Sequence, residues 1–367
     1  MRKLLLFALA IITFSACDKY LGDRTDTDFL TPPEFSQRPA FYVPVQPALQ
    51  GFLAPTDVLY GFDELIYIVD SIQERIFAYD QSGMRIGSIG IPGVTRVAQD
   101  RKLDLLAIGK KDTTINGQSF SLSTIYRIDI TQGARVDIGK GQIINELVHP
   151  FYYKNTLGSD DANTQLTDIA VFGDNEFYVS RIGKFPGSNT IPPDDAVIIF
   201  NNQDKYQGPV FVNSDGSFVR NFFKKPVGLT TFMQPPQTSA QANRRDFIYC
   251  SADSSQDNAF RVRTIRYFSS ENGAGYEAAA PAEQDTSKAD GFINTPNKFK
   301  SPKGITIAGD GSNYIFVVDN TQDSLYQFTG NGLEGVPPPS SSSDKKNVIV
   351  SFGGNGIGLT EFKIHLL

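Results

Sequence analysis

A short phrase recurs along this chain, and each copy consists of three short apolar runs separated by turn residues. The clearest two copies lie near the two ends, at residues 55–58, 65–70 and 75–79 and at residues 302–306, 314–319 and 324–328. A unit of this size cannot bury both of its faces alone, so the copies must stack against one another. The recurrence therefore predicts a repeat architecture.

Five copies can be followed along the sequence, the middle three beginning near residues 95, 166 and 226. Where insertions are absent the unit is about 40 residues long, which is the length of a four-stranded propeller blade. The insertions fall between the expected strands, at residues 183–194, 234–245, 271–300 and 335–346. Because no long stretch shows a helical period, we expect an all-β fold, a β-propeller of four-stranded blades.

The last copy carries a family resemblance. Its three runs read Pro302-Lys-Gly-Ile-Thr306, Ile315-Phe-Val-Val-Asp319 and Ser324-Leu-Tyr-Gln-Phe328. Together they resemble an NHL repeat, as does the copy at residue 55, and residues 351–362 are similar to the segment that leads from one NHL blade into the next. The resemblance covers residues 55–362 and implies a six-bladed β-propeller that presents one face to a protein or glycan partner.

The count of copies departs from that family. Residues 41–45 look like an outer strand without the inner three, and residues 363–367 stand where the next Pro-x-Gly-Ile phrase would follow. We therefore expect a six-bladed design whose sixth blade is incomplete or degenerate in this chain. A five-bladed ring is the alternative.

The first residues have the layout of a secretory signal peptide. Arg2 and Lys3 precede an apolar run at residues 4–14, which is too short to span a bilayer as a helix. Residues 14–17 resemble the lipobox of bacterial lipoproteins, although Phe14 stands where Leu, Val or Ile is more usual, and a plain secretory signal is the alternative. The lipobox implies cleavage before Cys17 and lipidation of its sulfur.

These features divide the chain into three parts: a signal peptide at residues 1–16, a polar tether at residues 17–40 and a β-propeller domain at residues 41–367. We expect a lipoprotein of the cell envelope that is held at the outer membrane by its N-terminal lipid. With Cys17 lipidated, Cys250 has no partner for an intramolecular disulfide. It stands where other copies carry Ile or Val, so we expect a small buried hydrophobe.

The charge balance limits the partners. The formal net charge is −6, and loss of Arg2 and Lys3 would take it to about −8. An acidic chain without a basic run is not expected to bind nucleic acid, nor an anionic membrane surface by charge.

Three residues that open innermost strands are candidates for a channel site. Asp57, Arg96 and Asp168 hold equivalent positions in the first three copies. Because propeller sites usually lie at the central channel, we expect them to converge there. Such a cluster can bind a cation such as Ca²⁺, or a polar ligand such as a sugar. The interpretation that we favour is that the two carboxylates accept hydrogen bonds from backbone N–H groups.

A second candidate site is the patch at residues 149–154. His149, Tyr152 and Tyr153 bring an imidazole and two phenol rings together in an expected loop, which can form a stacking surface for a sugar or peptide. The alternative is a connector with its aromatic rings tucked under a sheet. Arg181 is a further candidate, because it follows a second strand near the place where Asp70 and Asp319 stand. Those aspartates we interpret as turn residues.

Catalytic signatures are sparse. The sequence has two histidines, which argues against a zinc enzyme, and it has no Gly-x-Ser-x-Gly motif. We therefore assign no catalytic residue, no metal ligand and no cofactor. The expected function is that of a lipid-anchored binding or scaffold module for an envelope protein or polysaccharide. The alternative is a metal-assisted hydrolase or lyase of the envelope, with a carboxylate site in the channel.

Overall fold

The computed structural model divides into two units, Met1–Ala48 and Leu49–Leu367, and the second carries the fold. The residues that the structure describes are 48–115, 117–132, 135–149, 161–183, 195–214, 217–219, 222–235, 245–254, 260–271, 273–278, 293, 295–309, 312, 314–328 and 348–353. The expected signal peptide, the tether and the strand at residues 41–45 lie outside this part of the chain, as do Cys17, Tyr152 and Tyr153.

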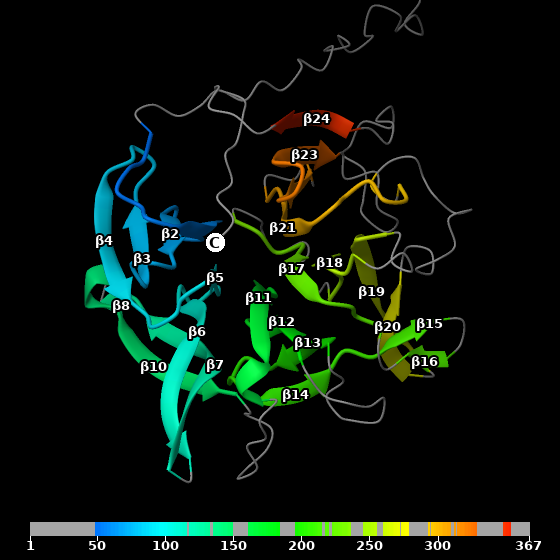
Figure 1. The fold of residues 1–367 in the computed structure, drawn as a ribbon, viewed down its shortest axis with the longest axis horizontal. Coiled ribbons are helices and arrows are strands. Elements are labelled where there is room, and N and C mark those ends of the chain that lie inside the picture. Colours follow the sequence, from blue (N-terminus) through cyan, green and yellow to red (C-terminus); the bar gives the residue numbers. More distant parts are fainter. Residues whose placement is uncertain are drawn as a thin grey trace, which may run out of the picture. The chain divides into compact units, whose positions relative to one another are not determined.

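Five antiparallel sheets of four main strands follow one another along the chain, and each is one blade (Figure 1). Blade 1 comprises β1 (Pro55–Tyr60), β2 (Ile66–Asp70), β3 (Arg75–Tyr79) and β4 (Arg85–Gly90). Blade 2 comprises β5 (Arg96–Gln99), β6 (Leu105–Ile115), β7 (Gln118–Asp129) and β10 (Gln142–Val148). Blade 3 comprises β11 (Gln165–Val171), β12 (Phe177–Ile182), β13 (Asp195–Phe200) and β14 (Tyr206–Pro209). Blade 4 comprises β17 (Pro226–Thr231), β18 (Phe247–Ser251), β19 (Val262–Ser270) and β20 (Gly273–Ala278). Blade 5 comprises β21 (Pro302–Ile307), β22 (Ile315–Asp319), β23 (Ser324–Phe328) and β24 (Val348–Gly353).

The remaining elements are small. A hairpin of β15 (Val212–Ser214) and β16 (Ser217–Val219) extends blade 4 through a parallel pairing of β15 with β20, and β8 (Thr131–Gln132) pairs with β9 (Arg135–Val136). The 3₁₀ helices of the described residues are η2 (Ile138–Lys140) and η3 (Asp161–Asn163). No helix in this part of the chain has the length and apolar character needed to cross a membrane.

An aspartate that ends the second strand explains the recurring turn. The carboxylate of Asp70 accepts the backbone N–H groups of Ile72 and Gln73 at 3.1 and 2.9 Å, and also that of Leu53 at 2.6 Å in the segment that enters the blade. Asp319 repeats this arrangement in blade 5, at the turn after β22 and the segment before β21. These bonds agree with the interpretation of both residues as turn residues.

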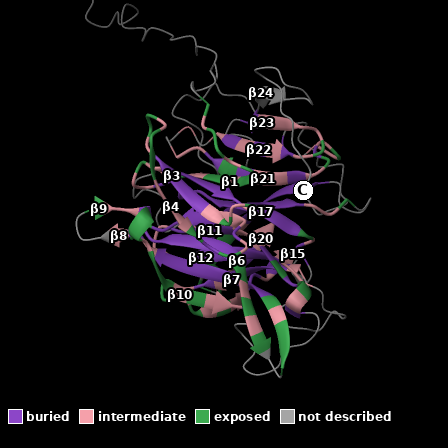
Figure 2. Ribbon diagram, turned by 60° about the vertical axis from the view of Figure 1, so that its left-hand side comes forward, coloured by how far each residue is buried: buried purple, intermediate pink, exposed green. Residues whose placement is uncertain are grey.

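The core lies between blades. The inner strands β1, β5, β11, β17 and β21 contact one another in that order around a common centre (Figure 1). Four apolar clusters fill the spaces between successive blades, because strands with near-continuous apolar runs present apolar side chains on both faces of a blade. In blades 1 and 3 the second and third strands are accordingly more deeply buried than the inner strand, whereas the far end of the β6–β7 hairpin is exposed (Figure 2).

The all-β fold and its four-stranded blades confirm the prediction from the repeats, and five blades in the described residues match the five-bladed alternative. The sixth blade that the family resemblance implies is not among them. Three outer strands, β10, β14 and β20, were not predicted. In particular, β20 lies within residues 271–300, which the sequence suggested to be an insertion.

Candidate functional site

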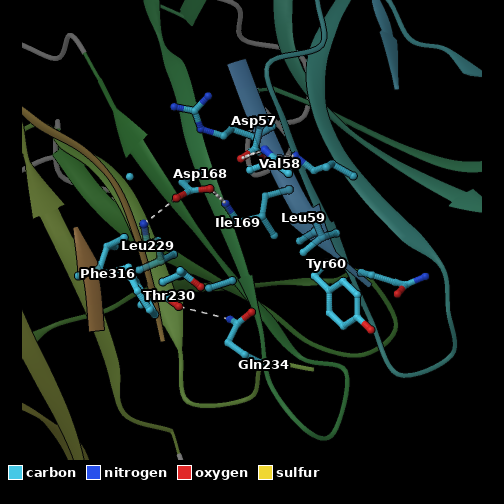
Figure 3. Close-up of a pocket in the computed structure, with 18 of the residues that line it drawn as sticks. Asp57, Val58, Leu59, Tyr60, Asp168, Ile169, Leu229, Thr230, Gln234 and Phe316 are labelled. Carbon is cyan, nitrogen blue, oxygen red and sulfur yellow. Dashed lines mark hydrogen bonds between the residues drawn. The ribbon is translucent and has the colours of Figure 1, made fainter. Parts of the chain in front are cut away.

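A cavity of about 840 Å³ lies where the five inner strands meet (Figure 3). Every inner strand contributes to its wall, and most of the wall is apolar. The polar side chains on the wall fall into two groups, one at the start of the inner strands and one near their ends. The first group contains Thr56, Asp57, Arg96, Asp168 and Lys303, and the second Tyr60, Gln99, Thr230, Gln234 and Thr306.

The two carboxylates of the first group join neighbouring blades. Asp57 Oδ2 accepts the backbone N–H of Val97 in blade 2 at 2.9 Å. Asp168 Oδ2 accepts the N–H of Leu229 in blade 4 at 2.7 Å (Figure 3). The other oxygen of each accepts the N–H of the next residue in its own strand, at 3.0 Å in β1 and 2.9 Å in β11. Both carboxylates therefore carry out the backbone role that the sequence analysis favoured.

The threonine before each aspartate adds a second bond across the same boundary. Thr56 Oγ1 donates to the carbonyl oxygen of Thr95 at 3.1 Å, and Thr167 Oγ1 donates to that of Pro226 at 2.6 Å. In both strands the pairing register shifts by one residue at this threonine. Such an irregularity re-aims the following side chain, which explains how the aspartate reaches the next blade.

Arg96 lies between the two carboxylates in the order of the blades. Its Nη1 donates to the carbonyl oxygens of Thr56 and Thr95 at 3.0 and 2.9 Å. Blade 2 thus carries a cation where blades 1 and 3 carry anions, and the structure places Asp57, Arg96 and Asp168 on one cavity wall.

The electrostatics of this group follow from its enclosure. Burial raises the pKa of Asp57, against the opposing effects of Arg96 and of the Val97 and Val58 N–H groups. Burial also raises the pKa of Asp168 to about 7, with Arg96 acting to lower it and the Asp57 charge to raise it. Asp168 therefore changes its charge near neutral pH, while its hydrogen bonds hold it in place.

Several wall residues were not predicted from the sequence. Lys303 follows Pro302 in the recurring phrase and precedes Gly304, the equivalent of Asp57 in blade 5, and this position was the signal that could have found it. Gln234 and Phe316 also line the cavity, yet they stand in an insertion and in an ordinary apolar run. Neither position carries a sequence signal.

The candidates His149 and Arg181 lie elsewhere, in a buried cluster. His149 Nε2 is 3.0 Å from Asp161 Oδ1, and Arg181 donates to Thr164 Oγ1 at 3.5 Å. Burial and the nearby Arg181 charge lower the pKa of His149 to about 4, against the effect of Asp161. Both side chains are fully buried. This geometry gives the imidazole a structural role, and ligand binding by the rest of the 149–154 patch stays a prediction.

In the part of the chain that the structure describes, no group of three or more His, Cys, Asp or Glu side chains is arranged so that it could hold a metal ion. Cys250 is a buried free cysteine in the core between blades 4 and 5, and burial raises the pKa of its thiol. Its environment is that of the small hydrophobe expected from the sequence.

No protein-family model matches the sequence, and no curated protein matches it. Solved structures with a similar arrangement include the PQQ-bound aldose sugar dehydrogenase of Streptomyces coelicolor, at TM-score 0.46 and 12% identity over 79% of this chain and 80% of that one. The regucalcin of Agrobacterium tumefaciens, described as a calcium-binding protein, has TM-score 0.44 and 10% identity over 77% and 72%. The virginiamycin B lyase of Staphylococcus aureus has TM-score 0.36 and 14% identity over 78% and 70%. The five four-stranded blades of the chain make it a β-propeller, and its function has to be argued from its own residues.

Proposed function

We propose that this chain is a lipid-anchored binding propeller of the cell envelope, which takes a segment of a protein or glycan partner into its central cavity. The observation that carries the proposal is the hydrogen bonding of the two carboxylates that line the cavity. Asp57 and Asp168 are the acids on the described wall, and all four of their oxygens accept backbone hydrogen bonds. These oxygens already serve the bonds that join and order the blades, so acid–base or metal chemistry would have to share them with those bonds.

The rest of the wall supports binding. Apolar side chains supply contact area, and the polar groups at the two ends can orient a bound segment. Arg96 and Lys303 supply positive charge at one end, and the Tyr60 hydroxyl and the Gln234 amide supply hydrogen-bonding groups at the other. A volume of about 840 Å³ lies in the range of typical ligand sites.

A variant that fills the cavity tests the proposal. Thr306 lines the cavity and is exposed, so Thr306→Trp adds bulk there without disturbing a core. Ile72→Trp is the matched control, because Ile72 is 54% exposed and lies in the β2–β3 turn outside the cavity wall. Immobilised domains, residues 18–367, are incubated with solubilised envelope proteins and with purified envelope polysaccharides. We expect the wild type and the control to retain one specific component and Thr306→Trp to lose it.

Equal retention by all three proteins would contradict a cavity site. The alternative of a metal-assisted hydrolase or lyase has its own readout. It requires that a divalent cation such as Ca²⁺ raise the melting temperature of the wild type, and that Asp57→Asn abolish the effect. The binding proposal expects no such cation-dependent stabilisation at this site.

A further inference from the structure

The space between blade 5 and blade 1 differs from the other four spaces between blades. Each apolar cluster between successive blades combines a face of one blade with a face of the next. The cluster on the open face of blade 1 contains Ile68, Phe77 and Tyr79 with Leu49 and Phe52, and no described residue of blade 5. Strands β21 and β1 likewise form no contact comparable to those between the other inner strands described.

The corresponding face of blade 5 is less buried than its equivalents. Val318 and Leu325 lie on this face, are half-buried and line the cavity. Their equivalents in blade 1 are Val69 and Ile76, which are fully buried against blade 2. The apolar pattern of blade 5 is thus suited to a neighbour on this side.

A pair of glycines shows the same difference at the inner strands. A Cβ atom on Gly228 of blade 4 would lie 3.1 Å from the carbonyl oxygen of Lys303 in the next inner strand. At the equivalent Gly304 of blade 5, the one atom within 4 Å would be Cβ of Val318 in the same blade, at 3.9 Å. The next inner strand, β21, therefore lies close to β17, whereas no described strand lies equally close to β21 on its other side.

A buried amide marks what the neighbour must supply. Gln327 is fully buried, and neither the nitrogen nor the oxygen of its side-chain amide has a hydrogen-bond partner among the described residues. It lies on the same face as Leu325, because residues two apart on a strand share a face. The equivalent of Gln327 in blade 2 is Arg127, which reaches across to Asp204 of blade 3 at 2.7 Å. A buried amide without partners is costly, so the neighbour is expected to offer backbone groups to Gln327.

A phenylalanine that recurs before the inner strands suggests which segment of the chain could be this neighbour. A phenylalanine precedes the first residue of β1, β17 and β21 by three positions, as Phe52, Phe223 and Phe299. Each packs on a ring of its own blade, with centroid distances of 5.7 Å to Phe77, 5.0 Å to Tyr249 and 5.5 Å to Tyr326, respectively. Phe299 also belongs to the cluster that covers the preceding blade. After β24 the sequence Phe362-Lys-Ile-His365 begins with the same Phe-Lys pair as Phe299-Lys-Ser-Pro302.

We propose that residues 354–367, which lie outside the described part of the chain, cover this face of blade 5. Phe362 would pack on Val318 and Leu325, and the backbone of the segment would bond the Gln327 amide. Its reach is sufficient, because the nine residues from Gly353 to Phe362 span up to about 30 Å. The distance from an outer to an inner strand of a blade is about 14 Å. This proposal is read from a cross-link and a melting temperature, whereas the proposed binding function is read from the retention of a partner, so the two proposals can fail separately.

Disulfide formation tests the placement. The double variant Phe362→Cys with Leu325→Cys is prepared in the full mature chain carrying Cys17→Ser, and Cys250 is buried and left unchanged. We expect mild oxidation to give an intramolecular cross-link in most molecules, seen by mass spectrometry of digested protein. The matched control pairs Phe362→Cys with Gln203→Cys, an exposed position in blade 3, and is expected not to cross-link.

A stability measurement completes the test. Phe362→Ala is expected to lower the melting temperature by several degrees, as loss of a buried aromatic ring does, whereas Ile72→Ala at an exposed position is expected to have little effect. Cross-linking no faster than in the control pair, or an unchanged melting temperature in Phe362→Ala, would overturn the proposal. A cross-link between two chains would also overturn it, in favour of a second copy as the occupant.

Discussion

The carboxylate of Asp57 in blade 1 lies 2.9 Å from the backbone nitrogen of Val97 in blade 2 and accepts its hydrogen bond. Asp168 repeats this bond 111 positions further along the chain, between blades 3 and 4. The inner strands of a propeller have a free edge toward the centre, and here two side chains satisfy part of that edge. The most polar residues of the cavity are thus also part of what holds it together.

Removal of the Asp57 carboxylate is expected to weaken the boundary between blades 1 and 2. Asp57→Ala leaves the Val97 N–H without its partner, which costs about 1–2 kcal/mol in the free energy of unfolding. Urea denaturation measures this loss. Asp112→Ala is the control, because Asp112 is exposed on the β6–β7 hairpin, and it is expected to change stability by about 0.5 kcal/mol or less. Equal losses in the two variants would contradict the role of Asp57.

Asp168 should make stability depend on pH near neutrality. Its pKa is raised from 3.8 to about 7 in the folded protein, so the folded state binds this proton more tightly than the unfolded state does. The free energy of unfolding should therefore fall as pH rises from about 4 to about 7, and level off above that. Asp168→Asn removes the titrating group and should flatten this part of the profile. Parallel profiles for the two proteins would show that the group does not titrate there.

The buried His149 is expected to make the free energy of unfolding depend on pH with the opposite sign. Its folded pKa of about 4 lies below the usual 6.5, so its contribution to stability is complete above pH 6.5 and is lost as pH falls toward 4. The loss is on the order of 3 kcal/mol. His149→Gln should remove this acid-side decline, whereas His365→Gln, the other histidine of the chain, should leave it unchanged. A decline that survives in His149→Gln would assign it to another group.

The charge cluster around Arg127 should be the most sensitive link between blades 2 and 3. Its guanidinium binds Asp100 at 2.6 Å, Asp104 at 3.0 Å and Asp204 of blade 3 at 2.7 Å, and all four side chains are largely buried. Arg127→Ala leaves three enclosed carboxylates without their cation and should cost about 3–5 kcal/mol. Lys111→Ala removes the cation of an exposed ion pair with Glu146 and should cost about 1 kcal/mol or less. Similar losses in thermal unfolding would contradict this ranking.

The repeat phrase predicted the inner three strands of each blade because those strands carry its markers. Asp70 and Asp319 recur because the turn after the second strand needs a carboxylate to accept several N–H groups. The outer strand β10 has no such marker, and its exposed residues include Ile143 and Ile144, so neither turn chemistry nor burial distinguishes it in the sequence.

The candidate site was predictable only in part. Equivalent positions in the repeat place Asp57, Arg96 and Asp168 at one end of the channel, because every inner strand runs through the centre in the same way. The bond between Arg127 and Asp204 joins residues 77 positions apart, and no local pattern indicates it. The burial of His149 depends on Asp161 and Arg181, which the fold brings together from separate segments.

Hydrogen exchange with and without the captured partner tests the central claim most directly. The proposed cavity site predicts that binding slows amide exchange in the inner strands β1, β5 and β11, whose free edges face the cavity, while the outer strands β4, β10 and β14 remain unchanged. Slowing that is confined to the outer strands, with no change in the inner ones, would place the partner on the rim of the propeller and contradict the account.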